Sequence, residues 1–462
     1  MRWLALGLCV LTLLMWLPAL TTPWWGDDYF FLQIAHKARL NHEPWWQAFW
    51  PEVRTGFWRP LSIDLYWRII EDEFCTTPLI AHAVNFLLWL LASVSVGLTA
   101  HLFARQLKWS SPWVIGALTA GIYGVNDVHF LPLHWASTAN SSILVLWTAL
   151  CFCCWIAAPS CTTKWRWVLC ALIPLLQLLA LFSKESSILI PLLLLCFSVF
   201  LMDTIKLGRQ EIIAWLSCTL VCGIWYCFFK HFTGSRDQAY SLVIGTNILR
   251  NLFALSAWLL NIPREALRMI MTGEILWGCI WAAAAAMPML GFIVLSLLPL
   301  RKKLSPQKIL AIVAFILLAY APYFFLASQS YEYYAAVAII FPLIILARGL
   351  SISTRPFIAI GLLCLSTFVS IHISRLVDYP SLIGRAHWAE KQFSYLTSQP
   401  IELPLVVQVN NAHQFYAISV PGLAWRLGIK ESDVVLSDTC PANTRKHLVQ
   451  NAQGDFQWQD CR

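Results

Sequence analysis

The chain of 462 residues is 59% hydrophobic and only 12% charged, which excludes an ordinary soluble globular domain and indicates a polytopic α-helical membrane protein. Its formal net charge of +8 is spread over short Lys/Arg loops without a basic block interleaved with aromatic residues, so the charge indicates membrane topology and not nucleic-acid binding. Most of the 15 cysteines lie inside apolar runs, where Cys behaves as a small hydrophobe, and no CxxC pair is followed by further ligands at zinc spacing.

The first apolar segment, Trp3 to Thr21, follows Arg2 and is long enough to cross a bilayer of about 30 Å at about 1.5 Å per residue. A cleaved signal peptide is the alternative, but the run is long and Ala19-Leu20-Thr21 is a poor small-residue cleavage site. Both interpretations place Asp27 and Asp28 outside the cytoplasm.

Ten further apolar segments follow, separated mostly by short loops. We predict them at Leu79 to Ala104, Trp113 to Leu131, Ser142 to Ala158, Trp167 to Phe182, Ser186 to Ile205, Glu211 to Phe229, Ile275 to Leu300, Ile309 to Ala327, Tyr334 to Gly349 and Phe357 to Ser374. The total is about eleven transmembrane helices, and an odd number places the two termini on opposite sides.

Basic residues gather in alternate loops. They are Arg105 and Lys108, Lys164 and Arg166, Lys206 and Arg209, Arg301 to Lys303, and Arg348 and Arg355. All five loops fall on one side if the N-terminus is cytoplasmic, as the positive-inside rule requires. The short tail and the lack of organelle signals favour a bacterial inner membrane, with the C-terminal domain in the periplasm.

Two longer loops fall on the outer side. The first, residues 22–78, is polar, aromatic and too broken to span, and we expect its amphipathic stretch Pro60 to Ile70 to lie in the interface with Trp58 and Trp67 facing lipid.

The second outer loop, residues 231–268, contains the semi-apolar stretch Asn251 to Leu260. We predict an interfacial or re-entrant helix there, because counting it as a span would reverse the side of the later basic loops. Both loops belong to a transmembrane catalytic domain that we expect to occupy residues 1–374.

The remaining residues, 375–462, have the composition of a soluble protein and predict a small α/β domain that leans on the membrane part. Leu405 to Val409 is strand-like, and a helix is predicted around Ala417 to Leu427. In an oxidising periplasm or lumen Cys440 and Cys461 would form a disulfide, and two unpaired thiols are the alternative.

The predicted topology brings polar residues of four loops to the outer membrane face. These are Asp27 and Asp28 after the first span, Asp127, His129 and His134 at the end of the third, Lys184 and Glu185 between the fifth and sixth, and Tyr333 and Tyr334 between the ninth and tenth. Each of these groups also has an explanation that requires no functional site: a solvated turn, core histidines, a local ion pair or an aromatic belt. Together they are more plausibly one site.

These residue types suit the transfer of a chemical group from a phosphate carrier to a hydroxyl. A carboxylate beside an apolar slot suits a general base, since partial desolvation raises its proton affinity. A Lys or Arg in the same slot suits a phosphate leaving group. A lipid-linked sugar supplies both the phosphate and the reason to work in a membrane.

Several short motifs occur in an order similar to that of the GT-C superfamily of membrane glycosyltransferases. They are Trp25-Gly26-Asp27-Asp28-Tyr29, Trp58-Arg59-Pro60-Leu61, His82-Ala83-Val84-Asn85, Val128-His129 through Trp135-Ala136-Ser137, Phe182-Ser183-Lys184-Glu185 and Tyr331-Glu332-Tyr333-Tyr334. The chain most resembles the protein O-mannosyltransferase type, especially the bacterial relatives of the lineage with tetratricopeptide tails, over most of residues 20 to 350.

The resemblance implies a polyprenyl- or dolichyl-phosphate sugar donor and a catalytic centre at the outer face. Matched residue by residue, it makes Asp27 the catalytic base and Asp28 its acidic neighbour. Lys184 resembles the donor-phosphate contact, with Arg59 and Tyr334 as further candidates. The acceptor pocket would contain Asp127, His129, His134, Glu185 and Tyr333. The chain departs from the family in having Leu131 where relatives usually carry an acidic residue, and in replacing the tetratricopeptide tail by a short domain.

The sequence thus predicts an inverting glycosyltransferase that moves a sugar from a polyprenyl phosphate to an acceptor hydroxyl of a protein, glycan or glycolipid. A transporter or flippase for lipids is the alternative, although the charges sit at span ends and no inverted repeat is visible. If the protein were instead a structural membrane scaffold, Asp27 and Asp28 would be dispensable. A divalent metal at Asp27 and Asp28 is left open, because oxygen ligands suit Mg²⁺ or Mn²⁺ but adjacent residues point in different directions.

Overall fold

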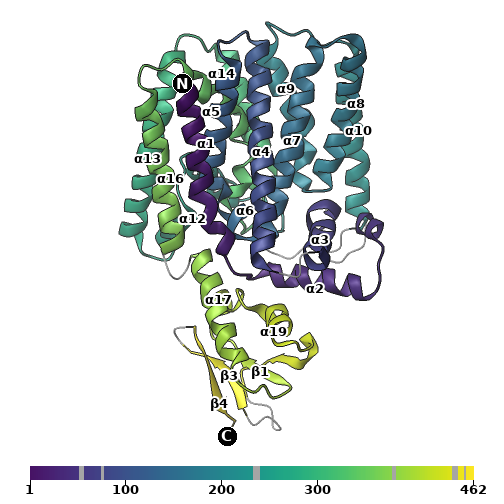
Figure 1. The fold of residues 1–462 in the computed structure, drawn as a ribbon, viewed down its shortest axis with the longest axis vertical. Helices are drawn as coiled ribbons and strands as arrows, with labels where there is room; N and C mark the ends of the chain where they lie inside the picture. Colours follow the sequence, from purple (N-terminus) through teal and green to yellow (C-terminus); the bar gives the residue numbers. More distant parts are fainter. Residues whose placement is uncertain are drawn as a thin grey trace.

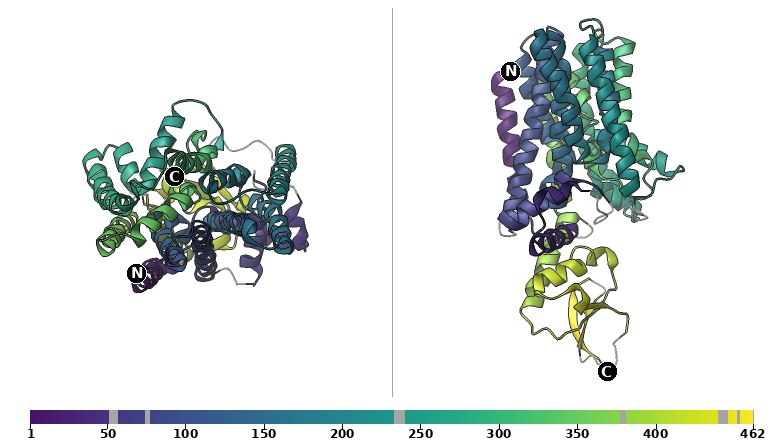
Figure 2. Two further views of the ribbon diagram at one scale, coloured as in Figure 1. Left: turned by 90° about the horizontal axis from the view of Figure 1, so that it is seen from above. Right: turned by 90° about the vertical axis from the view of Figure 1, so that its right-hand side faces the viewer.

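The computed structural model describes residues 1–50, 57–73, 77–232, 240–376, 381–439, 446–451 and 454–461. A bundle of long helices forms its larger part, and a small α/β unit lies against one end of the bundle (Figure 1). The N-terminus lies at the opposite end (Figure 2, right). We call the end against which the α/β unit lies the capped end.

The bundle is built from apolar helices, most of which are long enough to cross a membrane. They are α1 (Arg2–Trp16), α4 (Pro78–Gln106), α5 (Pro112–Val125), α6 (Phe130–His134), α7 (Ala139–Ala157), α8 (Thr163–Leu181), α9 (Ile190–Leu201), α10 (Arg209–Phe232), α13 (Ile275–Leu297), α14 (Pro306–Phe324), α15 (Ile340–Ser351) and α16 (Pro356–Leu376). Among the described residues eight candidate spans are long and apolar enough, α5 and the segment 127–134 form a ninth bent by 60°, and two shorter apolar helices remain. Each of the eleven predicted segments coincides with one of these, which confirms the predicted fold class.

Small residues allow the helices to approach closely. Gly97 on α4 faces Gly116 on α5, and a Cβ atom at either position would lie 2.8 Å from the carbonyl oxygen of the other. Helices in a bilayer associate through such close packing, since lipid is as apolar as the side chains. The bent segment that follows α5 supplies residues to the capped end.

The basic loops lie together at the end that carries the N-terminus. Arg348 donates a hydrogen bond to Ser110 at 3.2 Å, and Lys308 pairs with Asp203 at 3.1 Å. These contacts join four different loops of one end, as the alternating charge pattern predicts. Which side of a membrane this end faces stays a prediction.

The first outer loop folds across the capped end as α2 (Asp27–Leu40), two short helical turns (Trp45–Phe49 and Pro60–Leu65) and α3 (Tyr66–Glu73). The prediction that Trp58 and Trp67 face lipid is wrong. Trp67 is buried against Trp24 and Phe31, and Trp58 stacks on Trp225 at 6.2 Å between ring centroids. The reason is that α2 packs on α3, so the aromatic face of α3 contacts protein and not lipid.

The second outer loop contributes α11 (Asn247–Leu259) and α12 (Arg264–Met271), and the turn η10 (Glu332–Ala335) lies between α14 and α15. Among the described helices α11 does not qualify as a span, in agreement with the predicted interfacial or re-entrant helix.

The C-terminal unit, comprising the described residues from 381 to 461, is a small α/β structure. It contains α17 (Leu382–Thr397), β1 (Leu405–Gln408), α18 (Ala412–Phe415), α19 (Ser419–Leu427), β2 (Val434–Leu436), β3 (Lys446–Gln450) and β4 (Phe456–Asp460). Strand β1 lies between β2 and β3, parallel to both, and β4 is antiparallel to β3. The predicted strand and helix are β1 and α19. The predicted disulfide involves Cys440, which lies outside the described residues.

Candidate functional site

The two predicted acids open α2 at a turn that requires glycine. Gly26 has a φ of +58°, and a Cβ atom there would lie 3.0 Å from the ring of Tyr416 in the C-terminal unit. The turn places Asp27 and Asp28 in the first turn of the helix, where the helix dipole favours negative charge. Although adjacent in sequence, the two side chains have different surroundings.

Asp28 is fully buried and fastens α2 to the loop after α6. One carboxylate oxygen accepts hydrogen bonds from the backbone nitrogen and the hydroxyl of Ser137, at 2.8 and 2.5 Å, and the other accepts one from the nitrogen of Trp25 at 3.3 Å. Burial raises the pKa of Asp28 to about 7 in spite of these bonds. With both oxygens engaged, Asp28 positions the loop and its own neighbour.

Asp27 is partly exposed and accepts a hydrogen bond from the hydroxyl of Tyr416. Partial removal from water raises its pKa, and the bond from Tyr416 acts in the opposite direction. Tyr240 and Tyr331 lie within electrostatic reach of the same carboxylate. A carboxylate of raised proton affinity at the edge of an aromatic pocket is suited to remove a proton from a hydroxyl.

Lys184 is buried in a cage of three tyrosine rings. Its Nζ lies 4.6 Å from the ring centroid of Tyr333, 4.9 Å from that of Tyr334 and 5.7 Å from that of Tyr323. In the described part of the chain its ammonium forms neither an ion pair nor a hydrogen bond, although the side chain is only 4% exposed. Burial lowers its pKa, and an incoming anion would restore the full charge.

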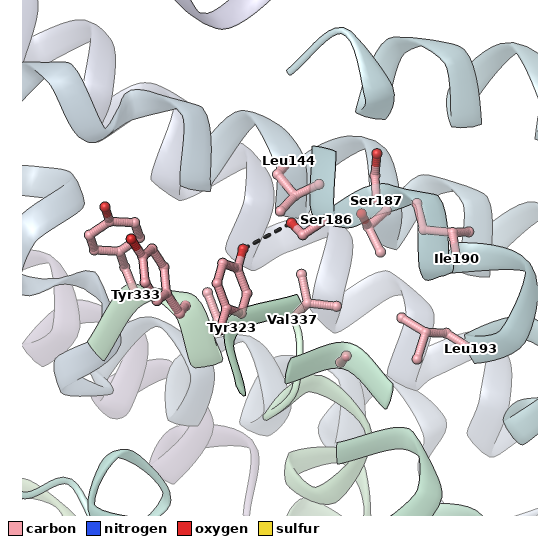
Figure 3. A pocket seen from close by; sticks show the side chains of 12 residues that line it. Leu144, Ser186, Ser187, Ile190, Leu193, Tyr323, Tyr333 and Val337 are labelled. Carbon is pink, nitrogen blue, oxygen red and sulfur yellow. Dashed lines mark hydrogen bonds between the residues drawn. The ribbon is translucent and has the colours of Figure 1, made fainter. Parts of the chain in front are cut away.

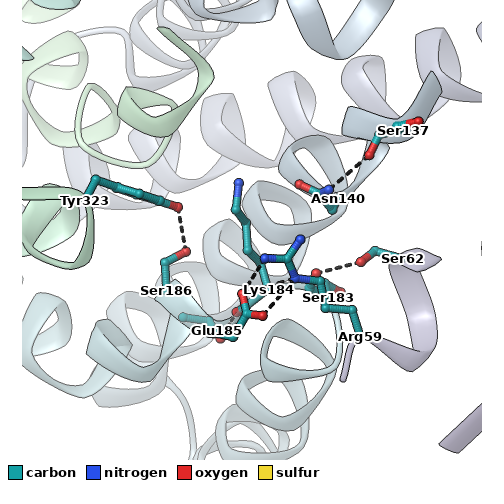
Figure 4. Close-up of polar contacts among 10 residues, drawn as sticks. Arg59, Ser62, Ser137, Asn140, Ser183, Lys184, Glu185, Ser186 and Tyr323 are labelled. Carbon is teal, nitrogen blue, oxygen red and sulfur yellow. Dashed lines mark hydrogen bonds and ion pairs between the residues drawn. The ribbon is translucent and has the colours of Figure 1, made fainter. Parts of the chain in front are cut away.

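Arg59 and Glu185 form an ion pair beside this cage. The guanidinium donates from Nε to Oε1 at 3.0 Å and from Nη2 to Oε2 at 2.6 Å. In Figure 4 the Lys184 side chain extends past this pair, between Tyr323 and Asn140. Glu185 compensates the charge of Arg59, whereas Lys184 forms no ion pair among the described residues.

Stacking continues from the cage into the bundle. Tyr323 stacks on Tyr334 with 4.1 Å between centroids and donates its hydroxyl to Ser186 at 2.9 Å. Behind these rings lies a cavity of about 10 Å³, lined by residues such as Leu144 and Val337 (Figure 3). That volume is enough for about one water molecule, so the cavity is too small for a sugar or a phosphate.

Two tyrosines connect Asp27 and Lys184. Tyr331, within electrostatic reach of Asp27, stacks on Tyr333 at 5.4 Å, and Tyr333 covers Lys184. Asp27, Lys184 and Tyr333 therefore lie in the same part of the capped end and are linked through Tyr331.

The two predicted histidines point elsewhere. His129 packs on the ring of Tyr123 at 4.6 Å and near Trp89, and His134 stacks on Phe130 at 4.4 Å. The Nε2 atom of His134 lies 3.0 Å from the guanidinium of Arg375. The interpretation of both as packed core histidines is therefore favoured over a place in the acceptor pocket.

Asp127 belongs to a separate acidic group with Glu265 and Glu332. Its backbone nitrogen donates to Asn261 at 2.9 Å, and its carboxylate lies near both glutamates. The described residues include no cluster of three His, Cys, Asp or Glu arranged to hold a metal ion. The side chains of Asp27 and Asp28 diverge, one toward Tyr416 of the C-terminal unit and one toward Ser137.

Glu332 provides a test of this acidic group. Burial and the neighbouring Asp127 raise its pKa from 4.5 to about 8. An acid that binds its proton more tightly when folded loses folded-state stability as the pH rises from about 4.5 to about 8. We expect Glu332→Gln to reduce the fall in Tm between pH 6 and pH 9 in detergent by several degrees, because the amide cannot ionise. The exposed Glu274→Gln is the matched control, and an equal fall in both variants would contradict the assignment.

Sequence reasoning missed Tyr323 and Tyr416. Tyr323 lies near the end of a predicted span, where an aromatic residue is expected at the interface. Tyr416 comes from the soluble tail and reaches Asp27 only through the tertiary fold, so no local pattern indicates it.

The sequence matches no protein-family model and no curated protein. Among solved structures the chain is similar to ArnT from Cupriavidus metallidurans bound to undecaprenyl phosphate, with 12% identity and a TM-score of 0.51 over 97% of this chain and 93% of ArnT. It is also similar to the Archaeoglobus fulgidus oligosaccharyltransferase tethered to an acceptor peptide, with 10% identity and a TM-score of 0.48, over 95% of this chain and 64% of the other. The chain thus spans less than two thirds of that oligosaccharyltransferase. The likeness to ArnT shows that the chain shares the overall fold of that protein.

Proposed function

We propose that this chain is a glycosyltransferase that moves a sugar from a polyprenyl phosphate to an acceptor hydroxyl at the capped end. The observation that carries the proposal is the caged Lys184 ammonium, which lacks an anionic partner among the described residues and lies two tyrosine rings from Asp27. The structural neighbour ArnT holds undecaprenyl phosphate, a ligand of the same chemical class. The basic loops at the opposite end support a cytoplasmic N-terminus and a periplasmic capped end, in a bacterial inner membrane.

The proposed reaction is a single displacement. The acceptor oxygen attacks the anomeric carbon while the bond from that carbon to the phosphate oxygen breaks, which inverts the configuration. Asp27 takes the proton of the acceptor hydroxyl. The polyprenyl phosphate leaves with the bonding electrons, and Lys184 stabilises the charge that develops on it.

The lipid chain also needs a path along the bundle. A shallow, largely open apolar groove runs on the outer face of α10 and is lined by Leu216, Thr219, Leu220, Gly223, Ile224, Cys227 and Phe228. Trp58, the neighbour of Arg59 in sequence, packs on Phe228 and Trp225. The groove therefore leads to the phosphate end of the site, and we assign it to the prenyl chain of the donor.

Filling this groove should weaken donor binding. A Cβ atom at Gly223 meets open space, so Gly223→Phe should fold and project into the groove. We expect KM for a long-chain polyprenyl-phosphate sugar to rise on the order of tenfold, equivalent to about 1.4 kcal/mol of lost chain burial. KM for a donor with two isoprene units should not change. Gly361→Phe on α16, also facing open space, is the matched control. Equal effects of Gly223→Phe on both donors would show that the groove does not bind the prenyl chain.

The function itself is tested with purified protein in proteoliposomes and a panel of radiolabelled polyprenyl-phosphate sugars. Cleavage of one donor, with release of the sugar to water or to an acceptor, is the expected result. Movement of headgroup-labelled lipid between leaflets without cleavage would establish the transporter alternative and overturn the proposal.

A further inference from the structure

The hydroxyl that contacts Asp27 comes from outside the helical bundle. Tyr416 lies in the C-terminal unit, between α18 and α19, and donates its hydrogen bond to the Asp27 carboxylate. Next to it the backbone nitrogen of Gly26 donates to the carbonyl oxygen of Ala417 at 3.0 Å. The Asp27 turn is therefore joined to the C-terminal unit by a backbone bond and a side-chain bond.

Further specific contacts join α2 to the C-terminal unit around these bonds. Gln33 on α2 donates to the carbonyl oxygen of Pro421 at 2.9 Å. A Cβ atom at Gly422 would lie 2.8 Å from the ring of Tyr29, so α19 approaches α2 closely. Arg426, paired with Glu390 at 2.7 Å, also reaches the Tyr29 hydroxyl at 3.5 Å. These contacts hold the segment that follows Tyr416 against α2.

Tyr416 is 38% exposed, and its hydroxyl contacts Asp27. A carboxylate has two oxygens, so a phenol that donates to one leaves the other able to accept from a second hydroxyl. A phenol is suited to this position because it donates a hydrogen bond without adding charge.

We propose that the C-terminal unit completes the acceptor side of the site, with Tyr416 as the positioning residue that holds one oxygen of Asp27 and directs the other to the acceptor hydroxyl. This inference rests on the proposed glycosyltransferase function. The unit then determines which acceptors reach the base, and the bundle binds the donor.

The groups that face Asp27 set the expected pH dependence. They are Asp28 from α2, Tyr240, Tyr331 beside η10, and Tyr416. Burial raises the pKa of each of the three tyrosines, so they stay neutral in the working range. The Tyr416 bond opposes the rise in the Asp27 pKa that burial causes. Removing that hydroxyl should therefore raise the Asp27 pKa further.

The test is Tyr416→Phe, which keeps the ring and removes the hydroxyl. The rate of transfer requires ionised Asp27, so we expect the acidic limb of its pH profile to move up by about one pH unit, with the rate recovering at high pH. Tyr395→Phe, an exposed tyrosine of the same unit, should leave the profile unchanged. An unchanged midpoint, or a loss that is equal at every pH, would overturn the proposal. If Tyr416→Phe does not fold, Tyr416→Met removes the hydroxyl in a second way.

An infrared titration separates this inference from the proposed function. The carbonyl band of protonated Asp27 is identified by subtracting the spectrum of Asp27→Asn, and its titration midpoint is compared between the wild-type protein and Tyr416→Phe. The midpoint should rise in Tyr416→Phe even if the protein cleaves no donor tested. A missing activity would then count against the glycosyltransferase alone, whereas equal midpoints would count against the role of Tyr416.

Discussion

Asp27→Asn is expected to lower kcat for sugar transfer by about 10²- to 10⁴-fold, the usual contribution of a general base, while leaving the fold intact. Asparagine has the size of aspartate and still accepts a hydrogen bond from Tyr416, but it cannot take a proton from the acceptor. The measurement is transfer of radiolabelled sugar in proteoliposomes, normalised to folded protein. Full activity of a folded Asp27→Asn protein would exclude Asp27 as the base.

The neighbouring acid is the matched control. Asp28 accepts three hydrogen bonds in the buried loop, so Asp28→Asn should act on folding, with a lower Tm and an activity that falls with the folded fraction. If both variants lost Tm and activity in parallel, the pair would be structural and the proposed mechanism would fail.

Lys184→Met is expected to lower kcat/KM by about 10²- to 10³-fold, as expected when one group that stabilises leaving-group charge is removed. The same variant should have a higher Tm than the wild-type protein, because methionine fills the cage without a buried, unpaired cation. Opposite changes in activity and Tm would identify Lys184 as a residue kept for binding an anion.

Arg59→Met serves as its control. This substitution leaves Glu185 without the guanidinium that donates to both of its oxygens, so Tm should fall together with activity. If Lys184→Met also lowered Tm, or retained full activity, Lys184 would be a structural cation and the donor-phosphate assignment would be wrong.

The helices of the bundle could be predicted because bilayer thickness fixes the length of a span and apolar residues fill it. Even Ile340–Ser351 was found, although it is too short to qualify as a span by itself. The amphipathic segment at Trp67 was placed wrongly. Nothing in its own sequence distinguishes a face covered by lipid from one covered by another helix, here α2.

For the site, topology could predict which loops meet but not where each side chain points. Asp27, Lys184 and Tyr333 come from three loops of the capped end and were predicted together. His134 comes from a fourth loop of that end, yet its ring stacks on Phe130, because the chain bends by 60° after α5 and turns it inward. Side-chain direction in so short a turn depends on packing that the sequence alone does not reveal.

The bond between Gly26 and Ala417 also delays the completion of the Asp27 turn during synthesis. The ribosome adds Gly26 before the second span and Ala417 after the last one, so the turn is completed only once the tail has been translated and folded. A ribosome-bound or truncated chain would carry Arg59 and Lys184 but not the finished turn.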